Sequence, residues 1–169
     1  MLTTVENIME IDKSLTEAEK PLLEHFIKVA TEKIEEYCNR KFEKQDFQDY
    51  IEGPTHYHNF KNFPIISTDY TDFSRLDKKK GIIYFKKPIK DLCIDYTAGF
   101  EKNEIPHILE LAILMYYKTF VSNGELRDFT ASSYRLADES INYVAIEKLF
   151  NGSLPSVVAN LVSGLRGRV

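Results

Sequence analysis

The sequence lacks several features that would assign it to a broad class at once. It has no tryptophan and only two cysteines, and no apolar run approaches the ~20 residues that a membrane-spanning helix needs. Cys38 and Cys93 show no CxxC spacing, which fits a reducing compartment. The first residues include Glu6, Glu10 and Asp12 and are unlike a signal peptide, which starts basic and then turns apolar. We therefore expect a cytoplasmic protein that does not enter a membrane.

Motifs of catalytic and nucleotide-binding sites are absent too. The chain contains no GxGxxG, GxxxxGK[ST], HExxH or GxSxG, and no spacing picks out a pair of carboxylates. His56 and His58 flank Tyr57, but no carboxylate or thiol lies close in sequence to complete a metal site, so we interpret them as histidines of a surface loop. The sequence predicts no enzyme, no catalytic residue, no metal and no cofactor.

Charge is spread unevenly along a chain whose formal net charge is −4. Acids exceed bases in residues 1–52 and 99–147, whereas bases exceed acids in residues 53–98 and no acid follows Glu147. Such blocks are typical of solvated faces. The alternative is a subunit whose acidic and basic parts meet different neighbours in an assembly. General nucleic-acid binding is not expected, because an acidic protein lacks the field that neutralises phosphates.

Helices are predicted toward both ends of the chain. The first covers residues 17–38, where Thr16 offers a capping box and apolar residues recur every three or four positions. The second follows Pro106 and covers residues 108–122. A short helix is predicted near residues 144–150, and a last one covers residues 155–165.

The helix at residues 108–122 is apolar almost all round. This indicates either a central helix or one that a neighbouring subunit covers. We expect Leu111, Leu114 and Met115 to be buried at the centre of a bundle, with Leu111→Ala or Leu114→Ala costing ~2–5 kcal/mol. Arg40 follows the first helix, and we expect it to bond helix carbonyls or a carboxylate, with Arg40→Ala costing ~1 kcal/mol.

The middle of the chain changes to a period of two, which is typical of strands. Strands are predicted at residues 47–51, 63–67 and 91–97, and a hairpin joins residues 72–76 to 81–85.

Lys78, Lys79 and Lys80 lie in the link of that hairpin, with further lysines nearby. Lysines at such a position commonly keep an exposed edge from pairing with other chains. The alternative is a contact patch for nucleic acid or for an acidic partner surface.

Several short motifs, in order over most of the chain, resemble the head-tail connector (adaptor) proteins of tailed bacteriophages. The motifs are Ile34-Glu35-Glu36-Tyr37-Cys38-Asn39-Arg40-Lys41-Phe42, Asn62-Phe63-Pro64-Ile65-Ile66-Ser67, Ile94-Asp95-Tyr96-Thr97-Ala98-Gly99-Phe100, Ile105-Pro106 and Leu154-Pro155-Ser156.

The resemblance implies a structural subunit of the virion neck, assembled in the bacterial cytoplasm. Members of this family form a ring, commonly of twelve subunits, that extends the DNA channel below the capsid portal. The expected partners are the portal protein, the next neck or tail-completion protein and further copies of the chain, although the isolated subunit can be monomeric. DNA is expected to pass without specific binding. The family's motifs identify no catalytic residue.

We therefore expect a single α+β domain over residues 1–169 that is mainly α. Residues 14–40 and 105–165 would form a helical bundle, and residues 42–97 an inserted antiparallel sheet or hairpin region. The tail from Ser163 is expected to be mobile in the free subunit, with Arg166 and Arg168 docking on the portal; a frayed basic terminus is the alternative. The alternative function is a small cytosolic binding module that uses the Lys-rich hairpin for an acidic ligand or nucleic acid.

Overall fold

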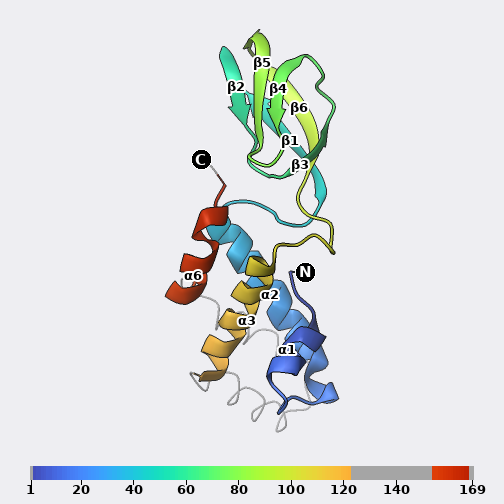
Figure 1. Ribbon diagram of the computed structural model, residues 1–169, viewed down its shortest axis with the longest axis vertical. Coiled ribbons are helices and arrows are strands. Elements are labelled where there is room, and N and C mark those ends of the chain that lie inside the picture. Colours follow the sequence, from blue (N-terminus) through green and yellow to red (C-terminus); the bar gives the residue numbers. More distant parts are fainter. Residues whose placement is uncertain (1, 123–153, 168–169) are drawn as a thin grey trace. The chain divides into compact units, whose positions relative to one another are not determined.

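The chain divides into two compact units. The computed structural model describes residues 2–122 and 154–167. We call residues 1–37 and 106–165 the helical unit, and residues 38–105 and 166–169 the sheet unit (Figure 1). The expectation that residues 1–169 behave as a single domain stays a prediction.

The helical unit is built from two long helices and several short ones. Its elements in the described part are α1 (Val5–Ile11), η1 (Glu17–Glu19), α2 (Lys20–Cys38), α3 (His107–Ser122), α6 (Ser156–Val162) and η2 (Ser163–Leu165). The capping box is confirmed, since the Thr16 N–H donates to Glu19 Oε2 over 2.7 Å. Sequence reasoning missed α1, which Thr4 caps. Within residues 2–122 and 154–167, no helix has the length and apolar character needed to cross a bilayer.

Aromatic rings join α2 to α3. The Phe26 ring of α2 lies 5.8 Å from the rings of Tyr117 and Phe120 and 6.1 Å from that of Tyr116, each in an edge-on arrangement. Edge-to-face packing is a favourable geometry for aromatic rings. The Tyr117 hydroxyl also donates to Asp12 Oδ2 over 2.8 Å, which ties the end of α1 to α3.

The prediction that Leu111 is buried at the centre of a bundle is wrong. Its side chain is 45% exposed, and Leu114 and Met115 are only half-buried. The buried face of α3 is Leu109, Ala112, Ile113, Tyr116, Tyr117 and Phe120. An almost wholly apolar helix carries no polar face to fix its rotation, and the large aromatic residues that pack on Phe26 set it instead.

Six strands form two antiparallel sheets in the sheet unit. The strands are β1 (Gln45–Ile51), β2 (Thr55–Asn59), β3 (Ile65–Thr68), β4 (Phe73–Asp77), β5 (Ile82–Ile89) and β6 (Leu92–Ala98). One sheet has the order β1-β6-β3 and the other β2-β5-β4. The predicted hairpin is confirmed as β4–β5. The interpretation of residues 56–58 as a surface loop is wrong, because they lie in β2.

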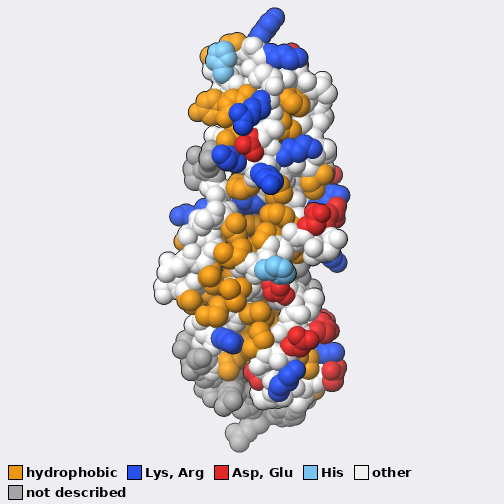
Figure 2. All heavy atoms as spheres, in the orientation of Figure 1, with side chains coloured by type: hydrophobic (Ala, Val, Ile, Leu, Met, Phe, Trp, Pro, Cys, Tyr) orange, Lys and Arg blue, Asp and Glu red, His pale blue; other side chains and the backbone are white. Residues whose placement is uncertain are grey.

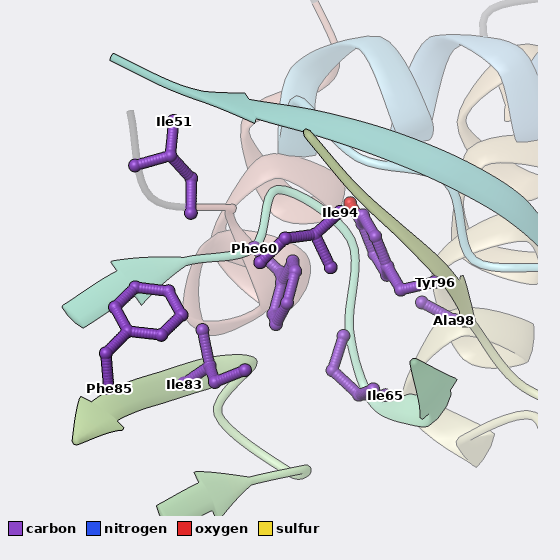
Figure 3. Close-up of a cluster of buried hydrophobic side chains, with 8 residues drawn as sticks. All are labelled: Ile51, Phe60, Ile65, Ile83, Phe85, Ile94, Tyr96 and Ala98. Atoms are coloured by element: carbon purple, nitrogen blue, oxygen red, sulfur yellow. The ribbon is translucent and has the colours of Figure 1, made fainter. Parts of the chain in front are cut away.

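The two sheets share one hydrophobic core. Side chains from β1, β3 and β6 meet side chains of β5 and the Phe60 ring between the sheets (Figure 3). The buried members are Ile51, Phe60, Ile65, Ile83, Phe85, Ile94, Tyr96 and Ala98. Because alternate residues of a strand point to opposite faces, each sheet turns its other face outward.

The expected fold, a mainly α helical bundle with an inserted sheet, is therefore wrong. The fold is α+β, but the sheets close on a core of their own, and residues 38–105 belong to a separate compact unit. Sequence reasoning recognised most of the strands. It did not recognise β2, and without β2 the strands did not indicate two packed sheets. Two packed sheets can bury apolar surface without a covering layer of helices.

Candidate functional site

Parts of three motifs that carry the resemblance, within residues 38–42, 62–67 and 94–100, meet in the sheet unit. The Gly99 N–H donates to the Pro64 carbonyl over 3.0 Å, and the Phe100 N–H donates to the Phe42 carbonyl over 2.7 Å. Gly99 has φ +106°, and a Cβ there would lie 2.5 Å from the Glu43 carbonyl oxygen. Only glycine tolerates both this backbone conformation and this close approach. These residues are a structural junction of the chain and present no reactive side chain.

Arg40 sits at the same junction and is almost fully buried. Its guanidinium carbon lies 3.5 Å from the centroid of the Phe63 ring and 4.9 Å from that of Phe42, and Nη2 donates to the Phe63 carbonyl. Burial lowers the pKa of Arg40 to about 10, so the group stays charged at neutral pH. In the sheet unit it contacts aromatic rings and a loop carbonyl, whereas helix carbonyls or a carboxylate were expected.

A polar network crosses the sheet unit around Asp49 of β1. Asp49 accepts from His58 Nε2 over 2.9 Å, from the Tyr96 hydroxyl over 3.1 Å and from the Lys61 N–H over 3.3 Å. The Tyr96 oxygen in turn accepts from the Asn62 N–H over 3.4 Å. His58 is thus tied to a carboxylate within the fold, whereas His56 is exposed.

The network keeps Asp49 ionised and Tyr96 protonated at neutral pH. Burial by itself would raise the pKa of Asp49, but the hydrogen bonds from His58, Lys61 and Tyr96 outweigh it and keep the pKa below its ordinary value of 3.8. Burial, and then the Asp49 carboxylate, raises the pKa of Tyr96 to about 12, so the phenol stays a donor. The hydrogen bonds of Asp49 and Tyr96 hold neighbouring side chains and backbone in place, which is typical of a network with a structural role. In the part of the chain that the structure describes, no group of three or more His, Cys, Asp or Glu residues could hold a metal ion.

The predicted basic patch lies at the turn between β4 and β5. Lys78 Nζ donates to the Ile66 carbonyl over 2.9 Å, so this lysine secures the turn to β3. Lys79 and Lys80 are exposed, and the structure places all three lysines together at one turn. Their role as a contact patch stays a prediction.

The predicted docking tail is only partly described. Ser163–Leu165 form the short helix η2, Arg166 is exposed, and the Gly167 N–H donates to the Cys38 carbonyl over 2.7 Å. The expected mobility of the tail in the free subunit and its docking role stay predictions. Arg168 lies outside the described residues.

A second apolar stripe on α3 is the feature that sequence reasoning left undecided, since it predicted either a central helix or one that a neighbouring subunit covers. Ile108 and Leu111, at i and i+3, are 38% and 45% exposed, and Leu114 and Met115 continue the stripe half-buried. In Figure 2, hydrophobic side chains gather over the helical unit, where Figure 1 draws α3 and α6. The all-round apolar pattern of α3 indicates this stripe in the sequence, because one face of such a helix can pack inward while the opposite face stays exposed and can bind a partner.

The comparisons with known proteins give no family. No family model matches the sequence, and no curated protein matches it at a significant level.

Proposed function

We propose that this protein is a structural subunit of a tailed-phage neck, a head-tail connector that assembles into a ring between the portal and the next neck protein. The chain works by presenting surfaces and carries out no reaction. Its proposed place is the virion neck, reached after assembly in the bacterial cytoplasm.

The observation that carries this proposal is the exposed apolar stripe on α3. A leucine and an isoleucine side by side on one helix face, each more than a third exposed, leave apolar surface in water that a neighbouring subunit would bury. In a ring, every subunit offers such a surface to its neighbour.

The motif junction supports the proposal in a second way. Some of the residues behind the resemblance to head-tail connectors fasten the sheet unit together, through the backbone bonds of Gly99 and Phe100 and the stacked Arg40. A shared signature of structural residues, with no reactive group, is what a family of assembly subunits requires.

The test is capture of the purified full-length chain by purified portal rings, observed by electron microscopy and native mass spectrometry. Leu111→Ser should fold as the parent does and fail to form a ring. Ile11→Ser is the matched control, because Ile11 is 44% exposed and Leu111 is 45% exposed, and this variant should assemble normally. A parent chain that ignores the portal would refute the proposal; equal assembly by Leu111→Ser and the parent would remove its main support.

The basic tail is the proposed portal-docking segment. Replacing Arg166 and Arg168 by Ala should weaken capture by the portal, and raised salt should weaken capture of the parent, because exposed charges are screened. If the double variant joins the portal as the parent does, the tail has no docking role.

A further inference from the structure

The two outward faces of the sheet unit differ in chemistry. The sheets pack on each other through their common core, so the outer face of β2-β5-β4 and the outer face of β1-β6-β3 lie on opposite sides of the unit (Figure 3). One face carries aromatic rings and a cation, and the other carries carboxylates.

The outer face of β2-β5-β4 presents a cross-strand row that we call the tyrosine–arginine row: Tyr57, Tyr84 and Arg75. Tyr84 of β5 pairs in register with Tyr57 of β2 on one side and with Arg75 of β4 on the other. The two tyrosine rings are 6.3 Å apart, and the guanidinium carbon lies 5.6 Å from the centroid of the Tyr84 ring.

All three side chains of the row are open to solvent. Tyr57 and Tyr84 are 53% and 37% exposed, and the Arg75 side chain is 71% exposed. The closest carboxylate to Arg75 in an ion pair is that of Asp77 of its own strand, at 4.0 Å. Tyrosine and arginine are the residue types that most often supply the binding energy of protein interfaces.

The outer face of β1-β6-β3 holds an open acidic groove of about 710 Å³. It is lined by Asp46, Phe47, Gln48, Ser67, Thr68, Asp69, Asp95, Tyr96 and Thr97. Neutral donors bond its three carboxylates: Thr97 Oγ1 to Asp46 over 2.7 Å, Gln48 Nε2 to Asp95 over 2.7 Å and the Asp95 N–H to Asp69 over 3.1 Å. Among the residues that the structure describes, no Lys or Arg lines the groove.

We propose that the tyrosine–arginine row of one copy docks into the acidic groove of the next copy. Arg75 would place its guanidinium among the three carboxylates, where charge-assisted hydrogen bonds form, and the tyrosines would cover the adjoining sheet surface. A second copy is the occupant because the same chain supplies both complementary surfaces.

This contact has a direct consequence for assembly. The two surfaces differ and lie on opposite sides of the sheet unit, so a pair of docked copies keeps one free groove and one free row for further copies. Such head-to-tail contacts close into a ring when the rotation between subunits allows it. The inference deepens the proposed ring and rests on that function.

The experiment measures the average mass of the isolated full-length chain by sedimentation, at concentrations up to ~1 mM and at salt from ~20 mM to ~0.5 M. The parent should exceed the mass of one chain at low salt and return to it at high salt. Arg75→Glu and Asp95→Lys should each weaken association on the order of a hundredfold. Lys79→Glu, which makes the same charge change as Arg75→Glu but at the exposed β4–β5 turn, should associate as the parent does.

An equimolar mixture of the two variants gives the decisive result. The Glu that replaces Arg75 faces the Lys that replaces Asp95, and the unchanged Arg75 of the second variant faces the unchanged groove of the first. Association should therefore return in the mixture. If either variant melts far below the parent, the neutral pair Arg75→Gln and Asp95→Asn replaces the single-variant comparison, with a loss of about tenfold expected for each.

The inference is overturned if the parent stays monomeric throughout, if both single variants associate like the parent, or if the mixture of folded variants does not recover. None of these results tests the proposed function, which the portal-capture experiment tests separately. Conversely, a parent that associates through this contact but ignores the portal would refute the connector role and retain the contact.

Discussion

At the scale of the residue, buried polar groups make contacts that stabilise the fold and that the sequence does not predict. Arg40 was expected to make one charge-assisted bond at a helix end, but it is stacked on Phe63, lies near Phe42 and bonds the Phe63 carbonyl. Phe63, on which Arg40 is stacked, lies more than twenty positions along the chain, so no local sequence pattern predicts this contact. The consequence is a larger role in stability than a surface arginine has.

Arg40→Ala should lower the free energy of unfolding by about 3 kcal/mol, because it removes a buried cation–π contact and a hydrogen bond from a charged donor. Arg40→Lys keeps the charge but loses the planar stacking surface, so an intermediate loss is expected. Denaturant titration with fluorescence or circular dichroism measures both. A loss for Arg40→Ala below 1 kcal/mol would mean that the stacked arrangement contributes little.

Asp49 should make the stability of the sheet unit depend on pH. Its pKa lies below 3.8 in the folded chain, so its stabilising contribution is complete above the unfolded pKa and is lost as pH falls through the folded pKa. Asp49→Asn should therefore cost about 1–3 kcal/mol at pH 7, and the gap between variant and parent should narrow below about pH 4. Denaturant titrations at pH 7 and pH 3 measure this gap, and a constant gap would contradict the assignment.

At the scale of the element, the sequence predicts that a helix forms better than it predicts which face of the helix is buried. The helix that becomes α3 is plain from its composition and from Pro106, but its rotation is not, since apolar residues occupy both faces. Packing against Phe26 of α2 turns Tyr116, Tyr117 and Phe120 inward and leaves Leu111 outside. The candidate site on α3 could therefore be suspected from the sequence but not located on it.

The strands show the same contrast, because their positions can be predicted from the sequence more readily than their pairing. Alternation correctly assigned β1 and β6, because one side of each contributes to a core that the period of two makes visible. The segment that forms β2 has polar residues at most positions, including His56 and His58, so no apolar alternation marks it. The tyrosine–arginine row depends on the register of β2 with β5, and register is a tertiary property that the sequence of one strand does not carry.

Two leucines of α3, two positions apart, give a sharp test of this rotation. Leu109 is fully buried and Leu111 is 45% exposed. Leu109→Ala should cost about 2–5 kcal/mol through lost burial and a cavity, whereas Leu111→Ala should change the free energy of unfolding by no more than about 0.5 kcal/mol. Thermal or denaturant unfolding of the two variants provides the comparison. Equal losses would mean that the helix is rotated differently or is buried all round.

At the scale of the whole molecule, each unit has its own hydrophobic interior. Phe26 is surrounded by the aromatic rings of α3 in the helical unit, and Phe60 lies within the core of the sheet unit, 4.4 Å from the Tyr96 ring by centroids. A chain of this length was expected to form one core. Two cores allow the helical unit and the sheet unit each to present a surface of its own, an apolar stripe on α3 and charged outer faces on the sheets.

Hydrogen exchange of two core variants should reveal whether the units open separately. Phe60→Ala should cost about 3–5 kcal/mol within the sheet unit, and we expect faster exchange to be confined to residues 38–105, because the apolar contacts it removes belong to that unit alone. Phe26→Ala is the reciprocal variant and should accelerate exchange in α2 and α3 while sparing the strands. Mass spectrometry of protected peptides at pH 7 resolves the two regions. If either variant accelerates exchange equally in both units, the chain unfolds as the single cooperative domain that its length predicts, and the two cores depend on each other for their stability.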